Sequence, residues 1–228
     1  MTITKEMKVP ARTTIEASAT QRRLAELREL AATDPTAAQD AAWAWLQELG
    51  SELPGKYAEL ALSELFAAGT PADVDGQTEG LLVGWPSRAP DLDAIGRLML
   101  PAAQAVTRVT MPWLGKKFDK AAQRGTNDVN RTAMVLTRLL APGYRMRRTG
   151  DHWEGFDMLN RVEQSVVSPG THVLVLDYES PEVANPFPIN RIRDEAVQLV
   201  PGTYLGAKLW HQADGYRQLA YWAAKAPA

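Results

Sequence analysis

The sequence predicts an α+β protein in which N-terminal helices pack on an antiparallel β-barrel or strongly curved sheet. Three observations predict this class. Apolar residues recur at helical spacing before residue 69. After residue 143, short apolar or alternating segments have the composition of strands. Turn sequences such as Ser168-Pro169-Gly170 separate these segments, and such short connections favour antiparallel neighbours.

Composition excludes several classes of function. The chain has 228 residues, a net charge of -2 and 45% hydrophobic residues, which suffice for a full core. It contains no cysteine, which excludes disulfides and thiolate ligands and suits a reducing cytoplasm. Nearly balanced charges create no global field for nucleic acid. We find no secretory signal pattern and no long apolar run, so we expect a cytoplasmic protein without membrane or nucleic-acid partners.

The chain divides into three predicted parts: a flexible tail, a helical segment and a barrel domain, over 1–19, 20–76 and 77–228. The helical segment contains three helices with apolar stripes, over 20–30, 36–49 and 56–68. Gly50 and Gly69 follow the second and third stripes, and we expect each glycine to end its helix.

The middle of the chain has mixed patterns. Residues 69–76 are rich in Pro, Asp and Gly and form the predicted boundary between the two larger parts. Residues 78–85 predict a first strand. Residues 91–106 return to helical spacing, although Pro101 should end or kink that helix. Residues 130–140 fit a strand or a helix, because short apolar runs do not distinguish the two.

Six further strands are predicted in the last third of the chain, over 144–148, 154–167, 171–178, 189–200, 204–211 and 216–223. Both faces of 171–178 are apolar, which is typical of a strand covered on both sides. We therefore expect the N-terminal helices to pack on the outside of this strand.

Five segments carry a family resemblance: Gly80 to Trp85, Met111 to Phe118, Leu174 to Tyr178, Asn190 to Glu195 and Tyr204 to Gly206. Their order resembles the GXWXG-type proteins and, more loosely, the lipocalin-like and nitrobindin-like barrels of the calycin group. The shared features are a glycine/tryptophan first strand, a Trp-x-Gly-Lys-x-Phe-like segment and a late Asp-Tyr strand. The resemblance covers about residues 78–223 and implies a calycin-like barrel with an apolar interior. Nitrobindin-like proteins hold haem through a late-strand histidine, which residues 216–223 lack, so haem is not expected.

Strand alternation predicts which side chains face the barrel interior. Along 154–166 the inward face carries Phe156, Met158, Asn160, Val162 and Val166. Along 189–200 neither face is wholly apolar, and the face with Ile192, Asp194 and Ala196 is predicted to be inward. On the late strands, one face carries Leu205, Ala207 and Leu209 with His211 at the rim, and another carries Leu219 and Tyr221.

Asp194 and His211 are the predicted catalytic residues. A carboxylate among apolar neighbours has a raised pKa and suits a general base, unless Asp194 pairs with Arg191 or Arg193. His211 is a candidate acid or base at the barrel mouth, with a plain surface position as the alternative. The three histidines have no metal-ligand spacing, so we expect no metal site.

The predicted ligand-binding residues combine hydrogen-bonding groups with flat apolar surface: Asn160, Tyr178, Trp113, Trp153, Met158 and Tyr221. Trp113, together with Lys116 and Lys117, is placed to contact a polar ligand head. The alternative is that Trp113 packs the barrel end and both lysines are solvated.

The sequence thus predicts a cofactor-independent barrel that encloses an apolar small molecule. As an enzyme it would act as a cyclase or isomerase, by holding a flexible substrate in a reactive conformation. Motifs for nucleotide binding and for serine hydrolases are absent. Two alternatives stay open: a carrier without turnover, and an interaction module with the stripe of 36–49 exposed. A homodimer also stays open.

Overall fold

The computed structural model describes residues 18–86 and 91–227. This part of the chain forms an α+β protein with helices packed on a nearly closed antiparallel barrel, as the sequence predicts. The five α-helices are α1 (Ala19–Ala31), α2 (Pro35–Glu52), α3 (Lys56–Ala68), α4 (Ala94–Val109) and α5 (Arg131–Leu140). Two short 3-10 turns, η1 (Pro181–Val183) and η2 (Ile189–Arg191), lie in the β8–β9 connection.

The strands form one 11-stranded sheet. They are β1 (Thr70–Pro71), β2 (Gly76–Gln77), β3 (Glu79–Gly84), β4 (Trp113–Asp119), β5 (Arg124–Val129), β6 (Arg147–Thr149), β7 (His152–Gln164), β8 (His172–Asp177), β9 (Ile192–Val200), β10 (Thr203–Gln212) and β11 (Gly215–Lys225). The main path runs β2-β4-β5-β7-β8-β9-β10-β11-β3, while β1 pairs with β9 and β6 pairs with β7.

The segment from β2 to β3 connects the two ends of the sheet path. Its first half pairs with β4 and its second half with β11, the two strands at the ends of the path. The Thr78 backbone N–H between them donates to the Lys116 carbonyl at 2.8 Å. A Cβ at Gly115 would lie 2.0 Å from the Thr78 carbonyl oxygen, so only glycine permits this close crossing.

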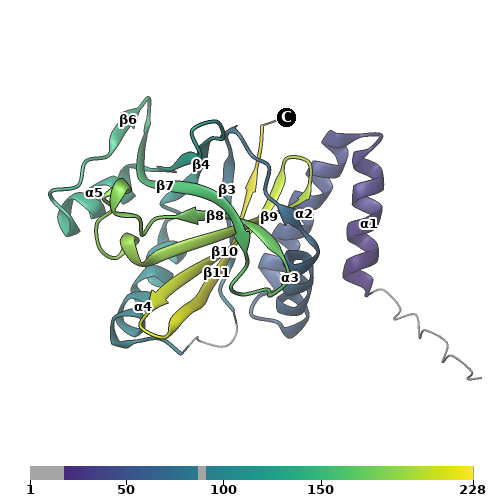
Figure 1. Cartoon of the computed structure of the whole chain (residues 1–228), viewed down its shortest axis with the longest axis horizontal. Helices are drawn as coiled ribbons and strands as arrows, with labels where there is room; N and C mark the ends of the chain where they lie inside the picture. Colours follow the sequence, from purple (N-terminus) through teal and green to yellow (C-terminus); the bar gives the residue numbers. More distant parts are fainter. Residues whose placement is uncertain (1–17, 87–90, 228) are drawn as a thin grey trace, which may run out of the picture.

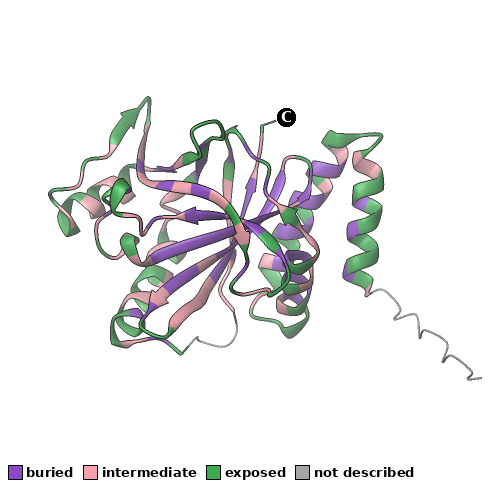
Figure 2. Cartoon of the chain, in the orientation of Figure 1, coloured by how far each residue is buried: buried purple, intermediate pink, exposed green. Residues whose placement is uncertain are grey.

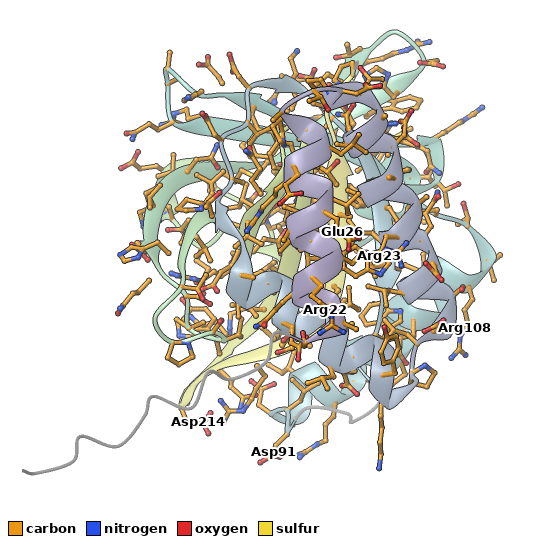
Figure 3. The ribbon with its side chains drawn as sticks, turned by 90° about the vertical axis from the view of Figure 1, so that its right-hand side faces the viewer. Arg22, Arg23, Glu26, Asp91, Arg108 and Asp214 are labelled. Atoms are coloured by element: carbon orange, nitrogen blue, oxygen red, sulfur yellow. The ribbon has the colours of Figure 1, made fainter. Side chains whose placement is uncertain are left out.

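Helices α1 to α3 cover one side of the barrel, while α4 and α5 lie on the other side (Figure 1). Capping residues define where the first two of these helices begin. Ser18 and Gln21 form a capping box at α1, and the Asp34 side chain caps α2 ahead of Pro35. Figure 3 looks onto α1, where the Arg23 guanidinium lies 4.4 Å from the Trp45 ring centroid of α2.

The larger core lies between α1–α3 and the outer face of the barrel. It contains the α2 stripe with Trp45 and Leu46, and it also takes Val175 of β8 and Leu205 of β10. Buried segments accordingly concentrate where the helices meet the sheet (Figure 2). The stripe of α2 is therefore buried, and strand β8 is covered on both faces, as its sequence predicts.

Several predicted boundaries change. Helix α2 continues through Gly50 to Glu52, because this glycine serves close packing against Val83 instead of ending the helix. Gly69 does cap α3. Helix α4 runs through Pro101 to Val109, so the proline does not end it. The Pro101 side chain lies on an exposed face of the helix, where the loss of one backbone hydrogen bond is tolerated.

Other segments also differ from expectation. Residues 131–140 form helix α5, capped by the Asn130 side chain. Of the predicted strand 144–148, only Arg147 and Arg148 lie in a strand, the short β6. The predicted strand 189–200 begins at Ile192, after a 3-10 turn.

The predicted face of β7 is wrong at its C-terminal end. Met158 is buried, but Val162 is 57% exposed and Val166, just past the strand, is also exposed. Strand β5 pairs with β7 only as far as Leu159, so the end of β7 extends past its neighbour. The apolar side chains at this end of β7 therefore have no neighbouring β5 residues to cover them.

The predicted faces of the late strands also need correction. Leu205, Ala207 and Leu209 face the α1–α3 core instead of the barrel interior, because the helices bury this outer face. In β11 a bulge opposite Lys208 and Leu209 lies between Leu219 and Tyr221. Tyr221 consequently lies in the core beneath α1–α3, whereas Leu219 packs against a second core in the barrel interior.

Residues 1–17 of the predicted tail lie outside the described residues. The last two residues of that tail are the N-cap of α1, Ser18, and its first residue, Ala19. Across residues 18–86 and 91–227, none of the helices combines the length and apolarity needed to span a membrane.

Candidate functional site

A cavity of about 440 Å³ opens into the barrel beneath α4 and α5. Its outer wall is apolar and includes Met99, Leu100 and Val106 of α4 and Leu136 of α5. Its inner wall includes Trp113 and other side chains of the barrel strands. The two helices therefore cover a hollow that the barrel alone would leave open.

Asp93 attaches the start of α4 to the barrel rim. Its carboxylate accepts from the Gly96 backbone N–H at 2.7 Å and from Trp210 Nε1 at 3.2 Å. Arg191 Nη2 lies 3.4 Å from the other carboxylate oxygen, and the Gly96 N–H lowers the pKa of Asp93. Elsewhere α4 and α5 pack loosely, since Gly96 is the single buried residue of α4 and α5 has none.

Asp91 and Asp214 lie together at one end of the molecule (Figure 3). Gln212 joins them, because its Nε2 donates to the Asp91 carbonyl and to Asp214 Oδ1. Gln212 Oε1 also accepts the Asp93 backbone N–H at 2.9 Å. The chain entering α4 is thus bound to the β10–β11 turn.

Lys116 forms the polar centre of the cavity. Its Nζ donates to Asp194 Oδ2 at 3.0 Å, to Asn127 Oδ1 at 3.0 Å and to Tyr178 Oη at 2.5 Å. Three donors meet three acceptors, so the ammonium is fully satisfied. Lys116 and Asp194 are both almost completely buried.

Aromatic rings surround the same ammonium. Lys116 Nζ lies 4.7 Å from the Trp222 ring centroid, 5.2 Å from that of Tyr178 and 5.3 Å from that of Trp113. Trp113 and Trp222 meet edge to face with centroids 5.9 Å apart. Cation–π attraction therefore adds to the ion pair between these two buried side chains.

Burial shifts the pKa values of this cluster. It lowers the pKa of Lys116 to about 8, although Asp194 opposes the shift by favouring the charged lysine. It raises the pKa of Tyr178 well above the usual value, and the adjacent Asp194 carboxylate adds to this. At neutral pH Lys116 is therefore mainly charged, and Tyr178 is a neutral hydrogen-bond donor.

Three further donors lie beside the cluster. Lys208 Nζ is 3.7 Å from Asp194 Oδ1, beyond hydrogen-bond distance, and its side chain is partly exposed. The indole nitrogens of Trp113 and Trp222 are buried without a hydrogen-bond partner among the described residues. All three residues line the cavity.

The structure brings together some of the sequence-predicted site residues. Asp194, Tyr178 and Trp113 line the same cavity. Asp194 pairs with Lys116 and Lys208, and neither Arg191 nor Arg193 is its partner.

Met158 and Asn160 are buried without lining that cavity. Met158 belongs to the interior core, and a Cβ at Gly125 would lie 3.4 Å from Asn160 Nδ2. Their inward orientation follows from the alternation of β7, but the cavity ends before it reaches them.

The remaining predicted site residues lie elsewhere. His211 is on the outer face, where Nδ1 lies 2.5 Å from Glu179 Oε1 and the ring stacks on Tyr216. Trp153 packs under the Arg148 guanidinium on β7, away from the cavity. Tyr221 belongs to the core beneath α1–α3, because of the bulge in β11.

Sequence reasoning missed Asn127 and Lys208 and did not distinguish Lys116 from Lys117. Lys117 is exposed and pairs with Glu154, whereas Lys116 is buried. The available signal was Asp194 itself, because a carboxylate on an inward face requires a buried cation.

The histidines lie outside the cavity, and none of His152, His172 and His211 lines it. Among the described residues, no group of three or more histidine, aspartate or glutamate side chains is arranged to hold a metal ion.

This arrangement can hold a polar group of an otherwise apolar molecule. Lys208 supplies a positive charge without a hydrogen-bond partner, and Asp194 Oδ1 is an acceptor without one in the described structure. The low polarity of the surroundings strengthens each of these electrostatic contacts.

No family model matches the chain, and no curated protein matches it. Among solved structures, one titled "Crystal structure of protein from Thermomonospora curvata" is 16% identical, with a TM-score of 0.37. The match covers 79% of this chain and 99% of the other. A likeness of this size supports no conclusion about fold or function.

Proposed function

We propose that this protein binds an apolar small molecule in the cavity beneath α4 and α5. One observation carries the proposal: an apolar cavity of about 440 Å³ ends at the buried Lys116–Asp194 pair. Binding sites for small molecules commonly have volumes of about 300–1,000 Å³, apolar walls and few polar groups. The walls would supply affinity, and the polar end would fix the orientation of the ligand.

The resemblance to GXWXG-type and calycin-group barrels supports the same proposal at the level of architecture, since those barrels act by what they enclose. We retain a cytoplasmic location as part of this proposal. The interaction-module alternative loses its main support, because the apolar stripe of α2 is buried in the core.

A second candidate function is proton-transfer catalysis, as in an isomerisation or cyclisation without a cofactor. The observation that favours it is the hydrogen-bonded group of Lys116, Tyr178 and Asp194 beside an apolar cavity. Asp194 would take a proton from one substrate carbon and return it to another, and Lys208 would stabilise the negative charge that develops on a substrate oxygen. Asp194→Asn should abolish turnover by an enzyme but only alter the affinity of a carrier.

Binding can be tested with N-phenyl-1-naphthylamine, a neutral apolar dye that fluoresces in apolar surroundings. Trp113, Trp210 and Trp222 line the cavity, so the dye should also quench tryptophan emission. Ala133→Trp places a large side chain on the cavity side of α5 and should weaken dye binding. Ala122→Trp, in an exposed turn, is the matched control. Equal dye binding by both variants, or none by the native protein, would contradict the proposal.

A further inference from the structure

We infer that the ligand of this cavity carries a single carboxylate, which Lys208 binds at the polar end of the cavity. The inference rests on the proposed function, since it concerns the same cavity, and it specifies the chemical class of the ligand.

The first argument is the charge of the polar end. Asp194 lies between two lysines, 3.0 Å from Lys116 Nζ and 3.7 Å from Lys208 Nζ. One carboxylate therefore faces two ammonium groups. Lys116 uses all three of its protons within the cluster, whereas Lys208 makes no hydrogen bond with any described residue. One positive charge at the cavity wall thus remains uncompensated.

The second argument is the balance of donors and acceptors. Trp222 is only 2% exposed, yet its indole N–H has no partner in the described part of the chain, and neither has that of Trp113. An indole nitrogen donates and does not accept. The corresponding spare acceptor among the cavity residues is Asp194 Oδ1, which already faces Lys208. Spare donors outnumber spare acceptors, so the complementary ligand group presents acceptor oxygens.

The third argument separates a carboxylate from other anions. The walls beyond the polar end are apolar, so a small hydrated anion would lose its water without compensation. A single uncompensated lysine matches a monoanion better than a dianionic phosphate. A carboxylate on an apolar tail neutralises the lysine, and it buries its tail against α4 and α5.

The test uses three molecules with the same ten-carbon tail and different heads: decanoate, decanol and decylamine. Each displaces N-phenyl-1-naphthylamine at neutral pH and low salt, below its micelle concentration. We expect decanoate to displace the dye at a concentration about tenfold lower than either of the others. Lys208→Met should remove this preference and Lys208→Arg should keep it, the preference being measured within each variant as the ratio of the decanoate and decanol concentrations that displace the dye.

Lys117→Met is the matched control, because Lys117 neighbours Lys116 but is exposed and does not line the cavity. It should keep the preference for decanoate. The inference is wrong if decylamine or decanol competes as well as decanoate, or if Lys208→Met keeps the preference. If the dye binds but the preference is missing, only this inference fails. If neither the dye nor any ten-carbon molecule binds, the proposed function fails with it.

Discussion

Lys116 Nζ lies 3.0 Å from Asp194 Oδ2, and this ion pair joins β4 to β9 through the barrel interior. In the sheet, β5, β7 and β8 separate these two strands. Both side chains are removed from water, which costs free energy that the ion pair offsets only with good geometry and further hydrogen bonds. Asn127 and Tyr178 complete the contacts of the lysine, so the pair depends on its neighbours.

Removing one partner should be worse than removing both charges. We expect Lys116→Met to lower the free energy of unfolding by about 3–5 kcal/mol, because it leaves the buried Asp194 carboxylate with one hydrogen bond from Tyr178 and with Lys208 at 3.7 Å. Lys116→Met with Asp194→Asn should recover part of this loss. Urea denaturation measures both variants, and Lys117→Met should stay within about 0.5 kcal/mol of the native protein. A double variant no more stable than the single one would contradict a paired role.

The lowered pKa of Lys116 predicts a pH dependence of stability. Its pKa is about 8 in the folded protein and 10.5 in the unfolded chain. Between these values the unfolded chain binds more protons, so the free energy of unfolding should rise with pH. The slope is at most roughly 1.4 kcal/mol per pH unit for one proton. The raised pKa of Tyr178 opposes this only above its usual value of 10.0.

The measurement is urea denaturation between about pH 7.5 and 9.5, a range that lies between the two pKa values. The double variant Lys116→Met/Asp194→Asn is the reference, because it lacks both members of the pair while the neighbouring Lys208 is kept. We expect the native protein to gain stability relative to this reference as pH rises. A constant difference would show that Lys116 does not titrate in this range.

The sequence predicted the fold class well because its signals are local. Helical stripes and turn sequences identified α1 to α3 and most strands of the barrel. The inward position of Asp194 followed from alternation with Ile192 and Ala196. Residues 131–140 could not be assigned, because ten residues of mixed pattern suit either element.

The cavity was harder to predict because long-range packing creates it. Leu205, Ala207 and Leu209 form the more apolar face of β10, yet they face the helices, so apolarity alone did not identify the interior. Lys116 and Lys117 are indistinguishable as sequence. A register shift between Trp113 and Gly115, together with the crossing at Thr78, determines which lysine is buried.

Gly50 provides a test of helix-to-sheet packing. In a helix, Gly→Ala normally stabilises by up to about 1 kcal/mol. A Cβ at Gly50 would lie 2.6 Å from the Val83 carbonyl oxygen, and that backbone cannot move aside easily. We therefore expect Gly50→Ala to destabilise by about 1–3 kcal/mol. Gly143→Ala is the control, because a Cβ there meets nothing within 4 Å. Thermal denaturation compares the two, and a stabilised Gly50→Ala would contradict the close approach.

The attachment of α4 at Asp93 should control access to the cavity. Asp93→Ala removes the acceptor for the Gly96 N–H and for Trp210 Nε1, which hold the start of α4 on the barrel. Losing this cap costs about 1 kcal/mol, too little to unfold the protein. We expect faster hydrogen exchange in α4 and faster release of N-phenyl-1-naphthylamine, with exchange in α3 unchanged.

Two variants separate this effect from a general loss of charge at the rim. Asp93→Asn keeps a capping oxygen and should preserve slow exchange, since asparagine caps helices as well as aspartate does. Asp91→Ala removes a nearby carboxylate but leaves in place the Asp91 backbone carbonyl that Gln212 binds. If Asp93→Ala exchanges like the native protein in α4, or if exchange rises equally in α3, Asp93 does not hold this helix. We expect faster dye release in Asp93→Ala but not in Asp93→Asn. The two variants lose the same charge and differ in the cap, so this result would assign ligand exit to the opening of α4.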